Sequence, residues 1–451
     1  MLNRESLYQS YLAILREEMI PALGCTEPIA IAYGAARARE ILGADPDRIV
    51  IGVCPSIFKN AKSVIVPNTQ HLKGVAASVA AGVAAGDASK ELEVLSEITE
   101  PQLESIRHLL DTCPIEVTIP EDSLNFDIRI TLYKGDHTAY VRIALFHTNI
   151  VCETKDNRIL KNVSLAEEVA DVSNTNDTEN ADSKENPADE AGHDQLVIST
   201  DRSLLTMRNI VDFADHADIE QVRSLLDRQI SFNMAIAEEG LKTAPGAAIG
   251  ATLLKYDGDS IKNKAKAYAA AGSDARMDGC EMPVIINSGS GNQGITCSVP
   301  VIVYARHLGV NDEKLYRALL ISNLTCIHIK TPIGRLSAYC GAVSAGAAAG
   351  AGIAYLHGGG YEEVVHTVVN ALANVSGIIC DGAKSSCAAK IASAVDAGIF
   401  GYQMYLNGKE FFGGDGIVAG GVEPTLKNIG RLGCDGMKGT NEEIVRMMLE
   451  C

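Results

Sequence analysis

Residues 115–159 read IEVTIPEDSLNFDIRITLYKGDHTAYVRIALFHTNIVCETKDNRI, and this segment determines the fold class. Apolar and polar residues alternate along IEVTIP, FDIRITLY, TAYVRIALF and IVCETK, which is the pattern of β-strands with one buried face. The alternation breaks at Lys134, Gly135 and Asp136, residues typical of a tight turn. The segment therefore predicts an antiparallel meander.

Other elements are expected around this meander. Before it, IVIGVC (49–54) has the length and branched composition of a buried strand, and LEVLSEI (92–98) is also strand-like. Helical patterns occupy GVAASVAAGVAAG (74–86) and PQLESIRHLLDT (101–112). The first 45 residues predict two helices separated by a break at 21–24, and glycine-rich breaks separate several helices after residue 201.

The predicted fold class is therefore α+β, a large helical catalytic domain with an inserted mixed α/β domain. We expect N-terminal helices of the catalytic domain in 1–45, the mixed α/β domain in 46–200 and the main helical domain in 201–451. Residues 164–195 are acidic and polar with almost no bulky apolar groups, which predicts a mobile loop because little burial offsets the entropy of ordering.

Charge and composition narrow the class of partner. The formal net charge of -18 argues against nucleic acid and anionic lipid, both of which need a basic face. Residues 338–356 are almost all Ala and Gly, which predicts a closely packed buried helix and no membrane span. Without an export signal the chain is expected in the cytoplasm, where its 12 cysteines stay largely reduced and free to bind metal.

The sharpest local motif is GCTEP at 24–28. Thr26 is a plausible N-cap and Pro28 suits a first helical turn, so Cys25 is expected at a helix N-terminus. There the helix dipole favours the thiolate, which can bind metal or accept a proton. The alternative is a small buried residue at a helix start.

A second motif, NSGSGNQGIT at 287–296, follows the apolar PVII. Glycines let a ligand approach the backbone, whose N–H groups can hold an anion such as a carboxylate. The candidate binding residues are Ser288, Ser290, Gly291, Asn292 and Gln293. The motif matches neither a Walker loop nor a dinucleotide fingerprint, and a plain glycine-rich turn is the alternative.

Three late cysteines form the third feature: Cys340, Cys380 and Cys387. Cys380 and Cys387 are seven apart, two turns along one helical face, although Gly382 argues that part of this stretch is loop. No C-x-x-C pair accompanies them, so structural zinc and the ferredoxin pattern are poorly supported. Buried core residues are the alternative.

Taken together, GCTEP, SGSGNQGIT and the contexts SAYCGA, GIICDGAK and SSCAAK resemble the L-cysteine desulfidase family, relatives of the iron-sulfur L-serine dehydratases. The resemblance covers nearly the whole chain except the acidic segment. It implies a 4Fe-4S cluster carried by Cys340, Cys380 and Cys387, with one iron open to substrate. It also implies that Cys25 acts at the active site, either as the base or as a resting ligand that substrate displaces.

Five further residues are secondary candidates. Lys59 and Asn60 lie at a probable strand-to-helix turn and Arg335 precedes Cys340; each could contact a carboxylate or cluster sulfide, or form a surface ion pair or cap. His328 could be a ligand or base, or a hydrogen-bonded core residue. Lys384 keeps a pyridoxal phosphate mechanism open.

A terminal cysteine caps the cluster in some related serine dehydratases, so Cys451 is either such a cap or part of a frayed end. The resemblance implies β-elimination of L-cysteine to hydrogen sulfide, ammonia and pyruvate. Dehydration of L-serine on the same cluster is the alternative, and a non-catalytic iron-sulfur redox sensor is the second. The expected partner is a small amino-acid substrate, and a homodimer is left open.

Overall fold

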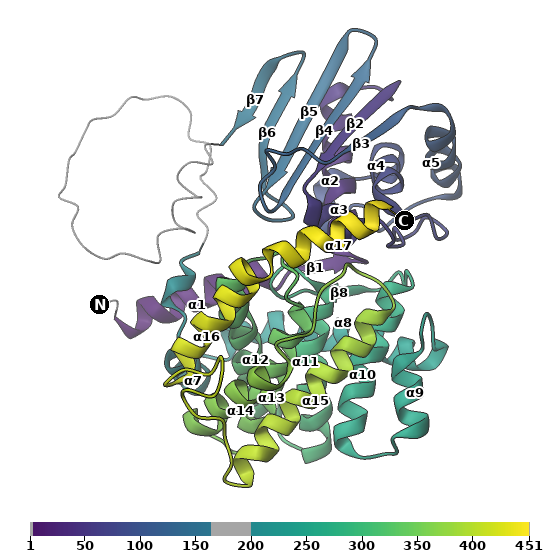
Figure 1. Cartoon of the computed structure of the whole chain (residues 1–451). Coiled ribbons are helices and arrows are strands. Elements are labelled where there is room, and N and C mark those ends of the chain that lie inside the picture. Colours follow the sequence, from purple (N-terminus) through teal and green to yellow (C-terminus); the bar gives the residue numbers. More distant parts are fainter. Residues whose placement is uncertain (1–2, 164–199, 451) are drawn as a thin grey trace, which may run out of the picture.

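The computed structural model describes residues 3–163 and 200–450 (Figure 1). The acidic segment 164–195 and Cys451 lie outside the described residues. The fold is α+β with a large helical part, as predicted. Figure 1 shows a sheet with its helices at the top and a body of packed helices below.

The main sheet has six strands in the order β3-β2-β4-β5-β6-β7. Their bounds are β2 (Arg48–Val53), β3 (Ile115–Thr118), β4 (Asp127–Lys134), β5 (His137–Ala144), β6 (Ile150–Lys155) and β7 (Arg158–Asn162). The predicted meander is confirmed for β4 to β7, where each strand pairs antiparallel with the next. The prediction is wrong for β3, which pairs parallel with β2 because helices connect the two strands.

The prediction of a strand at 92–98 is also wrong. A 3-10 helix, η1 (Ala88–Glu93), is followed there by a turn. Leu92, Val94 and Leu95 are buried in the core of the helical body, so their apolar character reflects helix packing and no sheet pairing. A short apolar run cannot distinguish these two cases.

Four helices accompany the sheet: α2 (Thr26–Leu42), α3 (Pro55–Ala61), α4 (Gly74–Ala85) and α5 (Glu100–Thr112). Helix α2 packs on β4 and β5 and also on α4. Its Ile31 and Ala35 belong to the core of the sheet, whereas its Ile29 and Ala36 belong to the core of the helical body. Helix α2 therefore joins the two cores, and its N-terminus lies where they meet.

The helical body is built from α1 and the helices that follow residue 200. Their bounds are α1 (Arg4–Glu18), α7 (Met207–His216), α8 (Glu220–Thr243), α9 (Ile249–Tyr256), α10 (Ile261–Met277), α11 (Gly291–Leu308), α12 (Asp312–Ile333), α13 (Gly341–Leu356), α14 (Tyr361–Val375), α15 (Ser386–Leu406), α16 (Val422–Arg431) and α17 (Lys438–Glu450). The predicted small-residue helix is α13, which packs closely against α15. A Cβ on Gly346 would lie 2.4 Å from the backbone of Ala394. Among the described helices none is long and apolar enough to cross a membrane.

Two short strands determine where the candidate site lies in the fold. β1 (Pro21–Leu23) lies in the predicted break and pairs antiparallel with β8 (Pro283–Ile285). Because β1 runs directly into Cys25 and β8 into the loop at 286–290, this pairing brings the first two motifs together. Helix α17, yellow in Figure 1, runs along the boundary between the sheet part and the helical body.

Candidate active site

One cavity at this boundary brings the three motifs together. Most of the predicted site residues line it: Cys25, Asn60, Ser288, Ser290, Asn292, Gln293, Arg335, Cys340, Cys380 and Cys387. Two predicted residues, Lys59 and Gly291, are buried but are not among its lining residues. The cavity also receives four polar residues that the motifs did not single out: Glu27, His147, Arg276 and Lys330.

Cys25 is the N-cap of α2, one residue earlier than predicted, and Thr26 opens the helix. The Cys25 Sγ donates a hydrogen bond to Glu27 Oε2 at 3.2 Å. The Thr26 hydroxyl donates to the same oxygen at 3.1 Å and can also donate to the carbonyl of Gly289 at 3.0 Å. Asn60 Nδ2 donates to Glu27 Oε1 at 2.9 Å, so both carboxylate oxygens of Glu27 have partners.

The charge state of this pair differs from the thiolate expected at a helix N-terminus. Burial raises the pKa of Cys25 well above its usual value, and the adjacent Glu27 carboxylate raises it further. For Glu27, burial acts to raise the pKa, but neighbouring His147 and Asn60 outweigh it and bring the pKa to about 2. The resting pair is therefore a Cys25 thiol beside a Glu27 carboxylate.

His147 lies on the loop after β5 and extends the cluster around Glu27. Its Nε2 is 4.0 Å from Glu27 Oε1, beyond hydrogen-bond distance. Its ring packs edge-on against Phe126 with 4.7 Å between centroids. Among the described residues the buried Nε2 has no hydrogen-bond partner.

The loop from β8 to α11 forms a tight turn facing Cys25. The backbone N–H of Asn287 donates to the carbonyl of Ser290, and that of Ser290 donates back to Asn287. Ser288 and Gly289 both adopt positive φ, at 49° and 78°. Strain at the non-glycine Ser288 is a feature of ligand-binding turns. Helix α11 then begins at Gly291. The N–H groups of its first turn have no partner within the helix, and they lie at the end of α11 that borders the cavity.

Arg276 lies at the last turn of α10, against the start of α11. It is 4% exposed, and its Nη1 donates to Asn292 Oδ1 at 3.1 Å. A Cβ on Gly291 would lie 2.4 Å from Arg276 Nε, so glycine is needed for the guanidinium to sit there. Within residues 3–163 and 200–450, neither Nε nor Nη2 of Arg276 has a hydrogen-bond partner.

The three late cysteines form another part of the cavity lining. Cys340 is the N-cap of α13, and Cys387 is the second residue of α15. Cys380 lies in a loop, as Gly382 indicated, and its N–H donates to the carbonyl of Ala338 while that of Cys340 donates to Ile378. This exchange, part of a bridge between 339 and 379, places Cys340 and Cys380 side by side.

The three thiols influence one another electrostatically. Burial raises the pKa of Cys340 to about 12, with further raising by the charges of Cys380 and Cys387. Burial lowers the pKa of Lys330 to about 8, although Cys380 and Cys340 act in the opposite direction. This part of the lining therefore consists of three thiols with a buried amine beside them.

The secondary candidates occupy different positions. Lys59 Nζ donates to the carbonyl of Cys380 at 3.0 Å and to Asn441 Oδ1 at 2.7 Å. Arg335 lines the cavity and pairs with Glu18 at 3.0 Å. These contacts occupy both cations with groups of the protein.

His328 and Lys384 are not brought to the cavity lining. His328 Nε2 lies 2.7 Å from Glu423 Oε2, which agrees with the hydrogen-bonded alternative. Lys384 pairs with Asp381.

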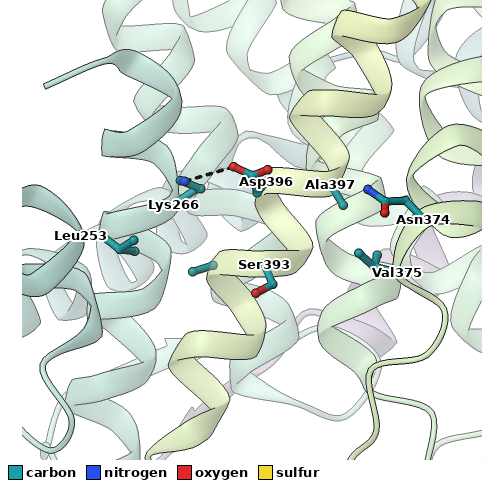
Figure 2. Close-up of a pocket in the computed structure, with 8 residues that line it drawn as sticks. Leu253, Lys266, Asn374, Val375, Ser393, Asp396 and Ala397 are labelled. Carbon is teal, nitrogen blue, oxygen red and sulfur yellow. Dashed lines mark ion pairs between the residues drawn. The ribbon is translucent and has the colours of Figure 1, made fainter. Parts of the chain in front are cut away.

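A second hollow, of about 340 Å³, lies between α10, α14 and α15 (Figure 2). Its charged residues are Lys266 and Asp396, which pair with each other at 3.0 Å. None of the predicted site residues lines it. With its charges satisfied internally, it offers no convergent chemistry, and the first cavity is the candidate active site.

Sequence reasoning missed Glu27 although it quoted the motif that contains it. A carboxylate two residues after an N-cap cysteine was a usable signal, because both side chains fall in the first helical turn. His147, Arg276 and Lys330 gave no local signal, since each reaches the cavity only through tertiary packing.

Residues 89–446 match the family model described as serine dehydratase alpha chain. Over almost its whole length the chain is also similar to UPF0597 proteins. One from Desulfitobacterium hafniense is 53% identical over 447 residues, covering 99% of this chain and 98% of the relative. Another, from Lachnoclostridium phytofermentans, is 48% identical over 443 residues, covering 98% and 100%. A third, from Treponema denticola, is 46% identical over 451 residues, covering 99% of each.

Proposed function

The chain belongs to the serine dehydratase alpha-chain family, and from this premise we propose that it is a lyase that eliminates the β-substituent of a small L-amino acid. The proposed substrate is L-cysteine, and with one water the products are hydrogen sulfide, ammonia and pyruvate. The observation that carries the proposal is a single cavity lined by a proton-sharing pair, a helix N-terminus and three thiols. These parts offer a group to remove the Cα proton, an anion site to orient the carboxylate and donors for a cofactor that can stabilise the leaving group.

Three cysteine thiols that line one cavity are donors of the kind that hold an iron-sulfur cluster. No group of three or more His, Cys, Asp or Glu side chains in the described parts of the chain could hold one metal ion. A cluster has separate iron atoms, so its cysteines need not meet at one point. Cys340, Cys380 and Cys387 would hold it, beside the amine of Lys330. When bound, the cluster supplies a thiophilic Lewis acid toward the substrate's sulfur.

Cys25 and Glu27 together remove the Cα proton. The Cys25 Sγ accepts the Cα proton while its own proton passes to Glu27 Oε2, 3.2 Å away. Coupling the two transfers avoids a free thiolate, which the raised pKa of Cys25 disfavours. The aminoacrylate that remains tautomerises to an imine, and water hydrolyses it to pyruvate and ammonia.

The rest of the site orients the substrate and excludes water. The N–H groups at the start of α11 favour an anion such as the substrate carboxylate. Cys25 is 3% exposed, so the proton transfer occurs away from bulk solvent. Asn60 fixes the orientation of Glu27 by its bond to Oε1.

Dehydration of L-serine is the second candidate, and the description of the matching family model favours it. The same residues would remove the Cα proton, and hydroxide would leave in place of sulfide. A redox sensor without turnover has no feature of the cavity to support it, because a sensor needs neither a proton-sharing pair nor an anion site.

Product analysis of the anaerobically reconstituted protein tests the proposal. L-cysteine and L-serine are supplied side by side, and sulfide, ammonia and pyruvate are measured. We expect equal amounts of the three products from cysteine and at least tenfold slower release of pyruvate from serine. Faster turnover of serine would assign the dehydratase instead, and no turnover of either would reject the lyase.

A Cys25→Ala variant tests the role of the thiol. We expect loss of turnover with most of the iron retained, because Cys25 is not one of the three cysteines that would hold the cluster. Loss of all iron in this variant would make Cys25 a ligand that holds the cluster.

A further inference from the structure

We propose that Arg276 binds the α-carboxylate of the substrate, together with the first turn of α11, and so restricts the site to amino acids with a free carboxylate. The inference rests on the proposed function for the identity of the substrate. It names a residue outside all three sequence motifs, and it replaces Arg335 as the cation expected at the carboxylate.

Arg276 is a buried cation, and two of its guanidinium nitrogens have no hydrogen-bond partner among the described residues. It is 4% exposed, and the two nitrogens are Nε and Nη2. Leaving a buried charged donor without a partner costs free energy, because the donor has given up its hydrogen bonds to water. Such a cost at the wall of a cavity indicates a group kept ready for a ligand.

Within residues 3–163 and 200–450, no carboxylate pairs with Arg276, and its one hydrogen bond goes to the neutral amide of Asn292. Arg335, in contrast, pairs with Glu18 at 3.0 Å and lies 4.0 Å from Glu17. Among the described residues that line the cavity, Arg276 and Arg335 carry guanidinium groups, and that of Arg276 is the one without a paired carboxylate.

Arg276 lies against the first turn of α11. Helix α11 has 18 residues, and its free N–H groups favour an anion at the same place. The guanidinium fills the space where a side chain on Gly291 would be, so its position is fixed relative to those N–H groups. Two N–H donors of a planar guanidinium match the two oxygens of a carboxylate.

Arg276 also lines the same cavity as Cys25 and the three cysteines Cys340, Cys380 and Cys387. A carboxylate held at Arg276 would therefore share one cavity with the group proposed to remove the Cα proton and with the thiols proposed to hold the cluster.

Calorimetric binding of L-alanine and L-alaninamide to the anaerobic holoenzyme tests the inference. L-alanine has a carboxylate but no leaving group, so binding is measured without turnover. We expect the wild type to bind L-alanine at least 30-fold more tightly than the amide. In Arg276→Gln the affinity for L-alanine falls at least 30-fold, and the preference for it over the amide disappears.

The kinetic signature with L-cysteine should match. Arg276→Gln raises KM more than it lowers kcat, because the lost contact exists in both the ground state and the transition state. Arg276→Lys restores part of the affinity. Arg306→Gln, an exposed arginine at the other end of α11, serves as the matched control and binds L-alanine as the wild type does.

Two results would overturn the inference: a wild type that does not prefer L-alanine to its amide, or a folded Arg276→Gln protein with unchanged affinity. If Arg276→Gln does not fold, Gly291→Ala replaces it, because the new Cβ displaces the guanidinium. Unchanged L-alanine binding in that variant likewise overturns the inference. Arg276-dependent binding without any turnover would reject the lyase and leave the carboxylate site standing, whereas turnover that ignores Arg276 would do the reverse.

Discussion

The two walls of the cavity differ in how their polar groups are paired. The sheet-side wall consists of Cys25, Glu27, Asn60 and His147, and both oxygens of Glu27 accept hydrogen bonds there. The helix-side wall consists of Arg276, Lys330 and the three cysteines Cys340, Cys380 and Cys387. It carries unpaired guanidinium donors and the Cys340 thiol, whose pKa is raised by burial and, to a smaller degree, by the charges of Cys380 and Cys387.

This difference indicates that the protein fixes the Glu27 carboxylate by itself and leaves the Arg276 guanidinium and the three thiols for ligands to complete. Asn60 Oδ1 and His147 Nε2 on the sheet-side wall also lack partners among the described residues. Glu27 is fixed by neighbours on α2 and α3, so its geometry does not depend on a bound group. The helix-side wall holds buried groups that are destabilising without a bound ligand. The free energy of ligand binding can offset this cost. Replacements on the two walls should therefore have different effects.

The largest effect is expected on the helix-side wall. Replacing Cys340, Cys380 or Cys387 by Ala should abolish both turnover and cluster binding, because a cluster held by two protein thiols dissociates. Iron content and visible absorbance after anaerobic reconstitution measure the loss. The wild type should also gain thermal stability on reconstitution, since a ligand that binds only the folded state stabilises it.

Cys434→Ala is the matched control, because this exposed thiol lies outside the cavity. It should bind the same amount of iron as the wild type. If Cys340→Ala also retains a full complement of iron, the helix-side wall is not the cluster site.

Replacements on the sheet-side wall should lower the rate of turnover and leave the cofactor in place. Glu27→Gln removes the acceptor of the Cys25 proton, and we expect kcat to fall by about 10²- to 10⁴-fold, the usual contribution of general base catalysis. Iron content should stay unchanged. Glu40→Gln, an exposed glutamate on the same helix, controls for the loss of charge and should keep full activity.

A Glu27→Gln protein that turns over normally would mean that Cys25 does not need the carboxylate. A protein that loses iron would place Glu27 in the cluster environment. Either result would remove the distinction between the walls.

The sequence predicted the local motifs of the site better than the tertiary contacts that bring these motifs together. Motifs at helix starts, such as GCTEP and SGSGNQG, are local, and their caps and glycines indicate where a backbone turns. The pairing of β1 with β8 was missed, although it brings these two motifs together, because three-residue strands have too little alternation to be recognised.

The same limit explains the residues that were missed in the site. Arg276 lies in an Ala-rich helix whose sequence predicts only helix, and its role depends on the absence of a partner, which no linear pattern shows. Thiolate at Cys25 was a reasonable expectation from the helix dipole. It failed because burial and the charge of Glu27 outweigh half a unit of positive charge at a helix end.

Lys59 connects the two walls, and its replacement should have an intermediate effect. From α3 it donates to the carbonyl of Cys380 and to Asn441 on α17 while being only 2% exposed. Lys59→Met leaves these buried acceptors unsatisfied, so we expect a loss of about 3 kcal/mol in the free energy of unfolding. Cluster retention should weaken as the loop carrying Cys380 loosens, which iron release to a chelator measures.

Lys73→Met, outside the cavity, is the control for loss of a lysine near the same helices. If Lys59→Met holds iron as long as the wild type, Lys59 stabilises the fold without positioning Cys380. If Lys59→Met unfolds in urea as the wild type does, the hydrogen bonds of Lys59 do not contribute to the free energy of unfolding.

The smallest effect is expected at Asp274 on α10, which differs from Glu27 in having few partners. It is 1% exposed, and Gly250 N–H donates to its Oδ2 at 3.0 Å while its Oδ1 has no partner among the described residues. Burial raises the pKa of Asp274 to about 6, against the backbone hydrogen bonds, and nearby Asp278 raises it further. Two buried carboxylates thus have pKa values shifted in opposite directions.

The sign of the pH effect follows from proton binding. Between about pH 4 and pH 6 the native state binds the Asp274 proton and the unfolded state does not, so stability falls as the pH rises through this window. The full shift corresponds to about 3 kcal/mol at most. Asp274→Asn keeps an acceptor for Gly250 and removes the titration, so its urea midpoint should change less between pH 4.5 and pH 7.5 than that of the wild type. Asp396→Asn, which removes the exposed carboxylate in the hollow of Figure 2, should keep the wild-type pH dependence. An Asp274→Asn protein with an unaltered pH profile would show that this carboxyl is better solvated than its burial indicates, and its contrast with Glu27 would then disappear.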